Sequence, residues 1–216
     1  MRRATWLMAV ALLVCAPVAL ARTVRGDSRA NRLKGGAGAD RIFGRGGADS
    51  LYGFAGADAL FGGAGDDRLL GGLGSDALRG EGGDDYLSGN SGADRLYGST
   101  GDDELQGRTG SDRLDGGAGN DTLIGGSGDD RIAGGPGGDA LCGEAGNDTL
   151  VGGSGLDIFC GGETGLTDTG AGDDTIDARD EFGEMVYCGE GNDTVLADMD
   201  DVVDPDCEVV QRGIAR

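Results

Sequence analysis

A nine-residue pattern repeats fifteen times without insertion or deletion between Gly26 and Cys160, and its fullest copies read Gly-Gly-x-Gly-x-Asp-x-Leu-x. Position 1 of every copy is glycine, and position 4 is glycine in every copy except the first, which has Arg29. Position 8 is apolar throughout, from Leu33 to Phe159. A short fixed period of this kind predicts a solenoid in which each copy is one structural step and stacked copies share one core.

The glycine and apolar positions predict the shape of each step. Glycines at positions 1, 2 and 4 permit positive φ, so we expect a tight turn over positions 1–6 and a three-residue strand over positions 7–9. Alternation of side chains then sends position 8 inward and positions 7 and 9 outward. Two repeats close one coil, so strands 18 residues apart stack in parallel at about 4.8 Å. The predicted fold class is all-β, a parallel β-roll or β-solenoid with two nonapeptide repeats per coil.

The aspartates at position 6 predict a metal site. Burial of one leucine per repeat contributes about 2 kcal/mol, which does not offset the entropy lost by nine ordered residues. Stacked carboxylates about 5 Å apart repel one another unless a cation lies between them, and a glycine turn points carbonyl oxygens at such a cation. Oxygen ligands in a roomy loop favour calcium over magnesium. The predicted ligands are the fourteen consecutive position 6 aspartates, Asp40, Asp49, Asp58, Asp67, Asp76, Asp85, Asp94, Asp103, Asp112, Asp121, Asp130, Asp139, Asp148 and Asp157.

Two copies, GGAGADRIF (35–43) and GGSGDDRIA (125–133), resemble the calcium-binding nonapeptide of the repeat-in-toxin (RTX), or haemolysin-type, family. The resemblance implies a calcium ion between the turns of successive coils, bound by aspartates and carbonyl oxygens of both. Pairing at a spacing of 18, from Asp40 with Asp58 to Asp139 with Asp157, implies up to about 12 ions. Weaker sites are expected in seven later copies that lack glycine at position 2, which carry Arg45, Phe54, Glu81, Asn90, Ser99, Arg108 and Glu144.

The two ends of the chain differ from the repeats. Residues 1–21 combine two arginines, an apolar run over residues 6–14 and a small-x-small ending, which predicts a secretory signal peptide cut before Arg22. A retained membrane anchor is the less favoured alternative, because the run is shorter than the roughly 20 residues that span a bilayer. We therefore expect a signal peptide (1–21), a calcium-binding roll (22–160), and degenerate repeats with a C-terminal cap (161–216).

Cysteine usage predicts two disulfides in an extracellular protein. Four cysteines remain after cleavage, an even number in an exported chain: Cys142, Cys160, Cys188 and Cys207. Cys142 and Cys160 both occupy position 9, two repeats apart, so they should lie on adjacent strands, within disulfide distance. The other two would then pair with each other and staple the cap. Asp174 and Asp193 lie in degenerate copies, where a calcium ligand and an ordinary surface role are both open.

The outer faces carry two further columns. Phe43 and Phe61 occupy position 9 two repeats apart, so they should stack, either to stiffen the roll or to bind sugar or protein. Three arginines at position 7 should form a basic ladder that pairs with neighbouring carboxylates such as Asp115; they are Arg95, Arg113 and Arg131.

Charge and composition exclude several classes of function. The chain has 39 acidic and 18 basic residues and a net charge of −21, which becomes −23 once a leader with two arginines is removed. Such a surface repels phosphates, so we expect no nucleic-acid partner, and no segment beyond the leader suits membrane insertion. The absence of histidine removes imidazole catalysis and histidine-based zinc sites, and we expect no enzymatic activity.

The expected function is that of a secreted calcium-binding β-roll, which folds on calcium and acts as an extracellular structural or binding module. Its expected partners are calcium ions and a cell-surface polymer or protein. One alternative is a cell-surface adhesin or an ice- or carbohydrate-binding module, although positions 7 and 9 lack the regular Thr or Asn array of an ice-binding face. The other is an RTX-type toxin or enzyme with unrecognised active residues.

Overall fold

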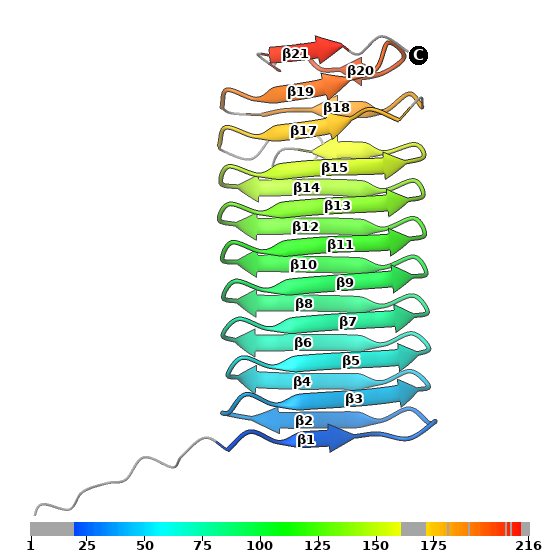
Figure 1. Ribbon diagram of the computed structural model, residues 1–216, viewed down its shortest axis with the longest axis vertical. Coiled ribbons are helices and arrows are strands. Elements are labelled where there is room, and N and C mark those ends of the chain that lie inside the picture. Colours follow the sequence, from blue (N-terminus) through cyan, green and yellow to red (C-terminus); the bar gives the residue numbers. More distant parts are fainter. Residues whose placement is uncertain are drawn as a thin grey trace, which may run out of the picture.

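The computed structural model describes residues 20–160, 172–180, 182–189, 191–205, 207 and 209–212. The chain winds into a column of coils whose strands alternate between two sheets, and none of these residues lies in a helix (Figure 1). Within the same described ranges, no helix offers the length and apolarity of a membrane span. Residues 1–19, which make up most of the predicted signal peptide, lie outside the described part.

All strands are parallel, and each pairs with the strand two places along the chain. Sheet A contains the odd-numbered strands β1 (Thr23–Arg25), β3 (Arg41–Gly46), β5 (Ala59–Ala64), β7 (Ala77–Gly82), β9 (Arg95–Thr100), β11 (Arg113–Ala118), β13 (Arg131–Pro136), β15 (Thr149–Ser154), β17 (Thr175–Ala178), β19 (Thr194–Ala197) and β21 (Val209–Arg212). Sheet B contains the even-numbered strands β2 (Arg32–Gly36), β4 (Ser50–Ala55), β6 (Arg68–Leu73), β8 (Tyr86–Ser91), β10 (Glu104–Thr109), β12 (Thr122–Ser127), β14 (Ala140–Ala145), β16 (Ile158–Cys160), β18 (Met185–Tyr187) and β20 (Val202–Val203).

The register confirms the predicted parallel β-roll with two nonapeptide repeats per coil. Leu96 on β9 lies between Leu78 on β7 and Leu114 on β11, each two repeats away. The side chains at position 8, from Ile42 to Phe159, are at most 2% exposed and form one continuous core. Because each coil contributes only two such side chains, the core is a narrow double row of leucines rather than a broad layer.

The prediction of three-residue strands is wrong, because most strands are six residues long and include positions 1–3 of the following repeat. Between β9 and β11, pairing runs over positions 7–9, skips position 1 and resumes at positions 2 and 3, where Gly117 pairs with Ser99. The chain bends at this point without leaving the sheet. The turn therefore shrinks to positions 4–6.

The bend explains why position 2 favours glycine. The residue at position 2 has a positive φ in thirteen consecutive copies, from Arg45 (89°) to Gly153 (122°). The described residues other than glycine that have positive φ are the seven that replace glycine at this position, such as Phe54 (81°) and Glu81 (80°). A side chain in this region is strained, by an amount on the order of 1 kcal/mol or more.

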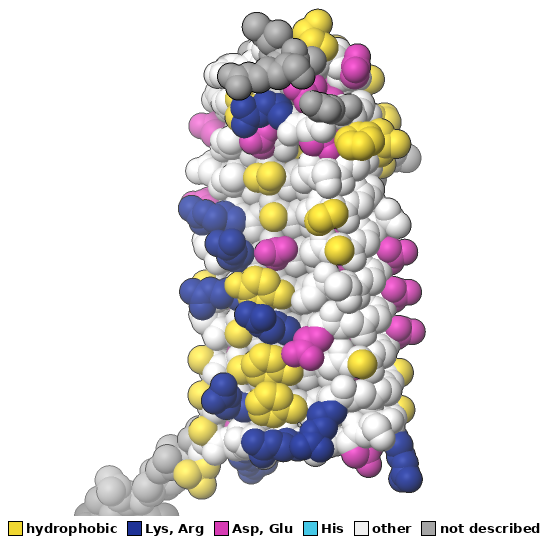
Figure 2. All heavy atoms as spheres, turned by 45° about the vertical axis from the view of Figure 1, so that its right-hand side comes forward, with side chains coloured by type: hydrophobic (Ala, Val, Ile, Leu, Met, Phe, Trp, Pro, Cys, Tyr) yellow, Lys and Arg dark blue, Asp and Glu magenta, His cyan; other side chains and the backbone are white. Residues whose placement is uncertain are grey.

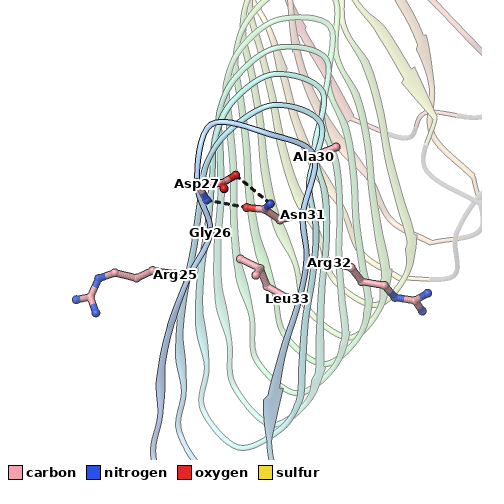
Figure 3. Close-up of a pocket in the computed structure, with 7 residues that line it drawn as sticks. All are labelled: Arg25, Gly26, Asp27, Ala30, Asn31, Arg32 and Leu33. Atoms are coloured by element: carbon pink, nitrogen blue, oxygen red, sulfur yellow. Dashed lines mark hydrogen bonds between the residues drawn. The ribbon is translucent and has the colours of Figure 1, made fainter.

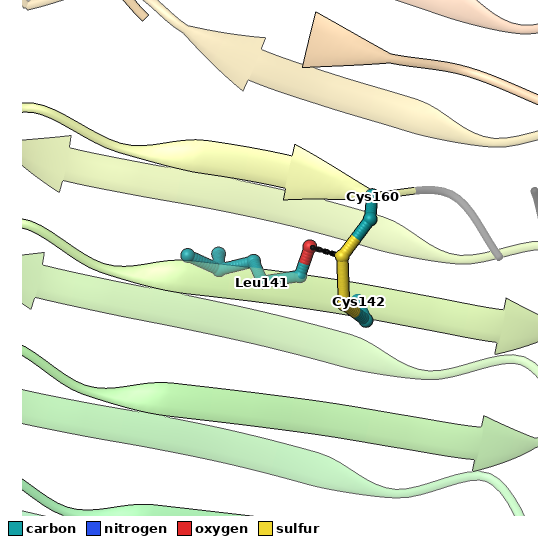
Figure 4. The surroundings of a disulfide bond; sticks show 3 residues. All are labelled: Leu141, Cys142 and Cys160. Atoms are coloured by element: carbon teal, nitrogen blue, oxygen red, sulfur yellow. Dashed lines mark hydrogen bonds between the residues drawn. A yellow bond between two sulfur atoms is a disulfide. The ribbon is translucent and has the colours of Figure 1, made fainter. Parts of the chain in front are cut away.

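Both predicted disulfides form. Cys142 and Cys160 join β14 to β16 with their Cα atoms 4.6 Å apart (Figure 4), and Cys188 and Cys207 are bonded with a Cα separation of 5.2 Å. Beyond residue 160 the repeat loses its register in the sequence, yet β17–β21 add two more strands to sheet B and three to sheet A. One disulfide thus joins the last regular coils, and the other lies among the irregular ones.

The outer face of sheet A confirms the aromatic stack. The rings of Phe43 and Phe61 are 4.9 Å apart and nearly parallel. Arg25 lies over Phe43, and Arg79 lies over Tyr97, with guanidinium-to-ring distances of 5.5 and 4.8 Å. Hydrophobic and basic side chains follow one another along one face of the roll in Figure 2. Because stacking already covers ring faces of both phenylalanines, this arrangement favours a role in stiffening the roll over a role in binding sugar.

The expected ion pairs of the arginine ladder do not form. Arg95, Arg113 and Arg131 are exposed and lie side by side on β9, β11 and β13. Among the described residues, the one salt bridge joins Arg179 to Asp177. Asp115 lies on the same strand as Arg113 but does not reach it, so three like charges stand in line without a protein counter-ion.

Candidate metal centre

Two columns of acidic side chains run inside the roll, one along each row of turns. Each residue of a column immediately precedes a strand, and its side chain is buried, with an exposed fraction of at most 6%. Column one precedes the strands of sheet A and contains Asp40, Asp58, Asp76, Asp94, Asp112, Asp130, Asp148, Asp174 and Asp193. Column two precedes the strands of sheet B and contains Asp49, Asp67, Asp85, Asp103, Asp121, Asp139, Asp157, Glu184 and Asp201, with the half-buried Asn31 at its start.

One oxygen of each aspartate is held by the preceding coil. The Oδ1 atom of Asp58 accepts a hydrogen bond of 2.6 Å from the backbone N–H of Asp40, 18 residues earlier. The same bond, at 2.6–2.9 Å, joins all twelve aspartate pairs that the sequence predicts, up to Asp139 with Asp157. The predicted pairs are therefore in contact, through a backbone donor rather than directly between carboxylates.

The other oxygen has no protein partner. Thirteen of the fourteen repeat aspartates, from Asp40 to Asp148, bury an Oδ2 atom that receives no hydrogen bond, and so does Asp174. An ionised oxygen buried without a partner is costly, and fourteen of them in two stacked columns compound the cost through mutual repulsion. A bound cation removes both penalties together.

Position 1 glycines leave room beside this oxygen. A Cβ atom on Gly53 would collide with the carboxylate of Asp58 and would lie 2.5 Å from the carbonyl oxygen of Gly71 in the next coil. A carboxylate oxygen and a carbonyl oxygen thus border the same space, which a side chain would fill. This donor set consists of oxygen alone and suits a hard cation such as calcium.

Backbone oxygens would have to supply most of the ligands. Within the described residues, no three His, Cys, Asp or Glu side chains converge as a metal cage. A site in either column would therefore combine the carboxylates of two successive coils with carbonyl oxygens of their turns. This explains why the turns need glycine, whose carbonyl groups can approach an ion without a side chain between them.

Without a metal, burial perturbs these carboxylates. Burial, helped by neighbouring carboxylates and opposed by the backbone hydrogen bond, raises the pKa values of four aspartates to about 7: Asp76, Asp85, Asp103 and Asp130. The pKa values of Asp67, Asp94, Asp121, Asp139 and Asp148 rise to about 6, again mainly through burial. A protonated or metal-bound carboxylate is thus favoured over a bare one.

The start of column two has a neutral amide in place of a buried carboxylate. Asn31 replaces aspartate there, and its Oδ1 accepts a hydrogen bond from the Asp27 N–H while its Nδ2 donates to Asp27 Oδ1, at 2.8 and 3.2 Å. Figure 3 shows these bonds across the first turn, with Leu33 pointing inward and Arg25 and Arg32 pointing out on opposite sides. A neutral side chain that supplies both donor and acceptor closes this turn without a cation.

The structure adds four acids to the fourteen predicted ones. Asp174 and Asp193, whose role the sequence leaves open, are buried in column one, while Glu184 and Asp201 in column two were not predicted. Their common signal is an acid two residues before an inward apolar side chain: Asp174 before Ile176, Glu184 before Val186, Asp193 before Val195 and Asp201 before Val203. A search for the full nonapeptide misses this shorter pattern.

The repeats match a known family model. The model described as RTX calcium-binding nonapeptide repeat (4 copies) matches residues 25–58, 52–87, 70–105, 88–123, 106–141 and 134–163, which together span well over half of the chain. No curated protein matches the chain. With the fold, the two acidic columns and these matches, the chain belongs to the RTX calcium-binding nonapeptide repeat family.

Proposed function

We propose that this chain is a secreted protein that folds on calcium and acts outside the cell as a structural or binding module. The observation that carries the proposal is the pair of buried columns, in which thirteen of the fourteen repeat aspartates, and Asp174, bury an oxygen that has no protein partner. Two disulfides and a predicted signal peptide support export, because disulfides persist in oxidising compartments.

Calcium would be held between successive coils by the position 6 aspartates and the carbonyl oxygens of their turns. When bound, the ion supplies positive charge and satisfies the buried oxygens; the glycine turns shape its site, and the backbone N–H groups hold the other carboxylate oxygen in place. Twelve repeat pairs provide twelve sites, and Asp174 and Asp193 extend column one by two more. Twelve ions carry +24 against a mature charge of −23, so binding converts a self-repelling chain into a nearly neutral body.

Native mass spectrometry of the mature protein tests this proposal, because it counts bound ions as integers. We expect about twelve to fourteen calcium ions per chain at millimolar calcium, the affinity range of extracellular modules. Magnesium at the same concentration is the control and should leave most sites empty, since magnesium retains its waters. A chain that binds only one or two calcium ions contradicts the proposal.

We further propose a scaffold role without enzymatic activity. The chain has no histidine, and the buried acids of its described part are arranged in two columns rather than around a single pocket. Such a body offers long, rigid outer faces as its working surfaces. A catalytic activity would contradict this role if replacement of one or two individual side chains abolished it while replacement of the outer-face side chains did not.

The unpaired arginine ladder favours a cell-surface polymer as the partner. Arg95, Arg113 and Arg131 repeat at the strand spacing of about 4.8 Å along a straight face, so they match a linear ligand with regularly spaced anions. Guanidinium groups bind carboxylates through paired hydrogen bonds. We propose that this face of sheet A binds an extended acidic polysaccharide that carries uronic-acid carboxylates.

A short oligogalacturonate and its methyl ester test the polymer proposal in calcium-loaded protein. The acid should bind and the neutral ester should not. Replacing Arg95, Arg113 and Arg131 by glutamine should weaken binding by about tenfold or more. A matched triple replacement of Arg32, Lys34 and Arg68 on sheet B should change it by less than about twofold. Equal losses in the two triple variants would show that only net charge matters and would overturn the assignment of the face.

A further inference from the structure

Glu184 is the one glutamate in the acidic columns, and it lies outside the nonapeptide repeats. It precedes β18 as Asp157 precedes β16, and the register pairs Met185 with Ile158. The N–H of Met185 donates to the carbonyl oxygen of Asp157, while the N–H of Val202 donates to that of Glu184. Glu184 therefore occupies the next step of column two, between Asp157 and Asp201.

Both carboxylate oxygens of Glu184 are buried and receive no hydrogen bond. The residue is 1% exposed, and neither Oε1 nor Oε2 has a donor. A repeat aspartate differs, since one of its two oxygens accepts a backbone N–H. Glu184 therefore has two unsatisfied oxygens where a repeat aspartate has one.

Two more carboxylates face this side chain. The charges of Asp201, the next residue of column two, and of Asp180 both raise the pKa of Glu184, after burial as the main cause. Their own oxygens are held by backbone donors: Asp201 Oδ1 accepts from Glu184 N–H at 3.3 Å, and the oxygens of Asp180 accept from Gly155 and Phe182 N–H at 2.7 and 2.9 Å. The carboxylates are thus fixed in position by the backbone.

No basic side chain neutralises this group within the described residues. The nearby Arg212 donates to the carbonyl oxygens of Asp198 and Asp201, at 2.9 and 3.4 Å, and forms no ion pair with their carboxylates. Glu184, with two bare, buried oxygens next to Asp201, must take up either a cation or a proton.

We propose that Glu184 and Asp201, with Asp180 beside them, hold a calcium ion at a site outside the nonapeptide repeats. The inference rests on the proposed calcium-dependent fold and extends it to residues that the family model does not match. As in the repeats, two carboxylates would contribute, with carbonyl or water oxygens completing the shell. The ion would fasten the segment between β17 and β18 to the last coils, beside the Cys188–Cys207 disulfide.

Glu184→Gln separates a cation from a proton, because glutamine has the shape and neutrality of protonated glutamate. Native mass spectrometry of the calcium-loaded mature protein should find one ion fewer than in the wild type. Glu104→Gln, on the outer face of β10, is the matched control and should leave the count unchanged. Asp180→Asn is the second variant, chosen because it leaves both column residues intact, and it should weaken the same ion by about tenfold.

Hydrogen exchange of residues 172–212 on the same samples shows whether the last coils remain folded. One lost ion with protected coils supports the site. An unchanged count in Glu184→Gln overturns it and identifies Glu184 as a protonated acid. If Glu184→Gln unfolds the last coils, the Asp180→Asn variant provides the test instead. An unchanged calcium affinity at every site of that variant also overturns the proposal. A wild-type chain that binds no calcium would instead refute the proposed function as a whole.

Discussion

The coils from Gly35 to Cys160 and those from 172 to 212 belong to the same two sheets, but they use different numbers of residues per coil. In the first region the steps along the columns are all of 18 residues, whereas in the second they are 26 residues from Asp148 to Asp174 and 19 from there to Asp193. The buried acid and the inward apolar residue two places later persist in both regions. The glycine turn persists along column one, at Gly172 and Gly191, but not along column two before Glu184 and Asp201, so this short pattern, rather than the nonapeptide, is the minimum that continues the roll.

The regions also differ in what holds them together. In the regular part, each coil repeats the same backbone bonds and the same aspartate contacts as its neighbours. Two disulfides close loops of 18 and 19 residues, one at the end of the regular part and one in the irregular part, each contributing about 3 kcal/mol in the chain-entropy account. Covalent links appear where the periodic interactions become less uniform, which suggests that they secure the end of an otherwise repetitive stack.

An inward charge should have the largest effect and should separate the two regions. Leu96→Asp buries an unpaired carboxylate in the middle of the core, at a cost above about 4 kcal/mol, and should abolish the folded roll. Val195→Asp should unfold only the last coils, because each coil contacts only its neighbours. Arg95→Ala on the outer face is the control and should stay within about 0.5 kcal/mol of the wild type.

Circular dichroism melts and hydrogen exchange in calcium measure these outcomes. Equal tolerance of Leu96→Asp and Arg95→Ala would show that the inner and outer faces are misassigned. Global unfolding by Val195→Asp would contradict the local coupling of the coils.

Loss of a single column carboxylate should have the next largest effect. Asp85→Ala interrupts column two in mid-roll, where cooperative coils extend on both sides, so the calcium midpoint for folding should rise severalfold. Asp174→Ala has few coils beyond it, so its midpoint should rise less. A calcium titration followed by circular dichroism compares the two. A larger shift for Asp174→Ala would place the cooperative unit at the C-terminal end instead.

Acidification should partly replace calcium. The folded-state pKa values of about 6 to 7 exceed the ordinary aspartate value of 3.8, so the metal-free roll binds more protons than the unfolded chain. Its stability is therefore greatest below about pH 4 and declines as the pH rises through 6 to 7. In excess chelator, we expect the β signal to grow as the pH falls from 8 to 5.5. A signal that stays flat over this window would contradict the raised pKa values.

Much of the regular region could be predicted from sequence, because a single period fixes coil length, register and the inward side chains. Leu96 and Asp85 could be placed from their positions in the repeat alone, as could the bond between Cys142 and Cys160. The strand length could not, because it depends on the backbone resuming its pairing after a positive φ at position 2. Glu184 and Asp201 were missed because they lie beyond the last regular repeat.

The arginine ladder shows a different limit of prediction from sequence. Periodicity correctly aligned Arg95, Arg113 and Arg131, but their pairing with Asp115 depends on the directions of long, exposed side chains. The repeat does not constrain those directions, since positions 7 and 9 face solvent. Sequence periodicity therefore predicts the interior of this roll better than the contacts on its surface.

The most direct test of the central claim is a calcium titration of the mature protein followed by far-ultraviolet circular dichroism. We predict a largely unfolded chain in excess chelator and a steep, cooperative gain of β signal at roughly 0.1 to 1 mM calcium, with no comparable gain in magnesium. A full β signal in excess chelator at pH 7.5 would contradict the account, because it would show that two buried leucines per coil hold the roll without a cation.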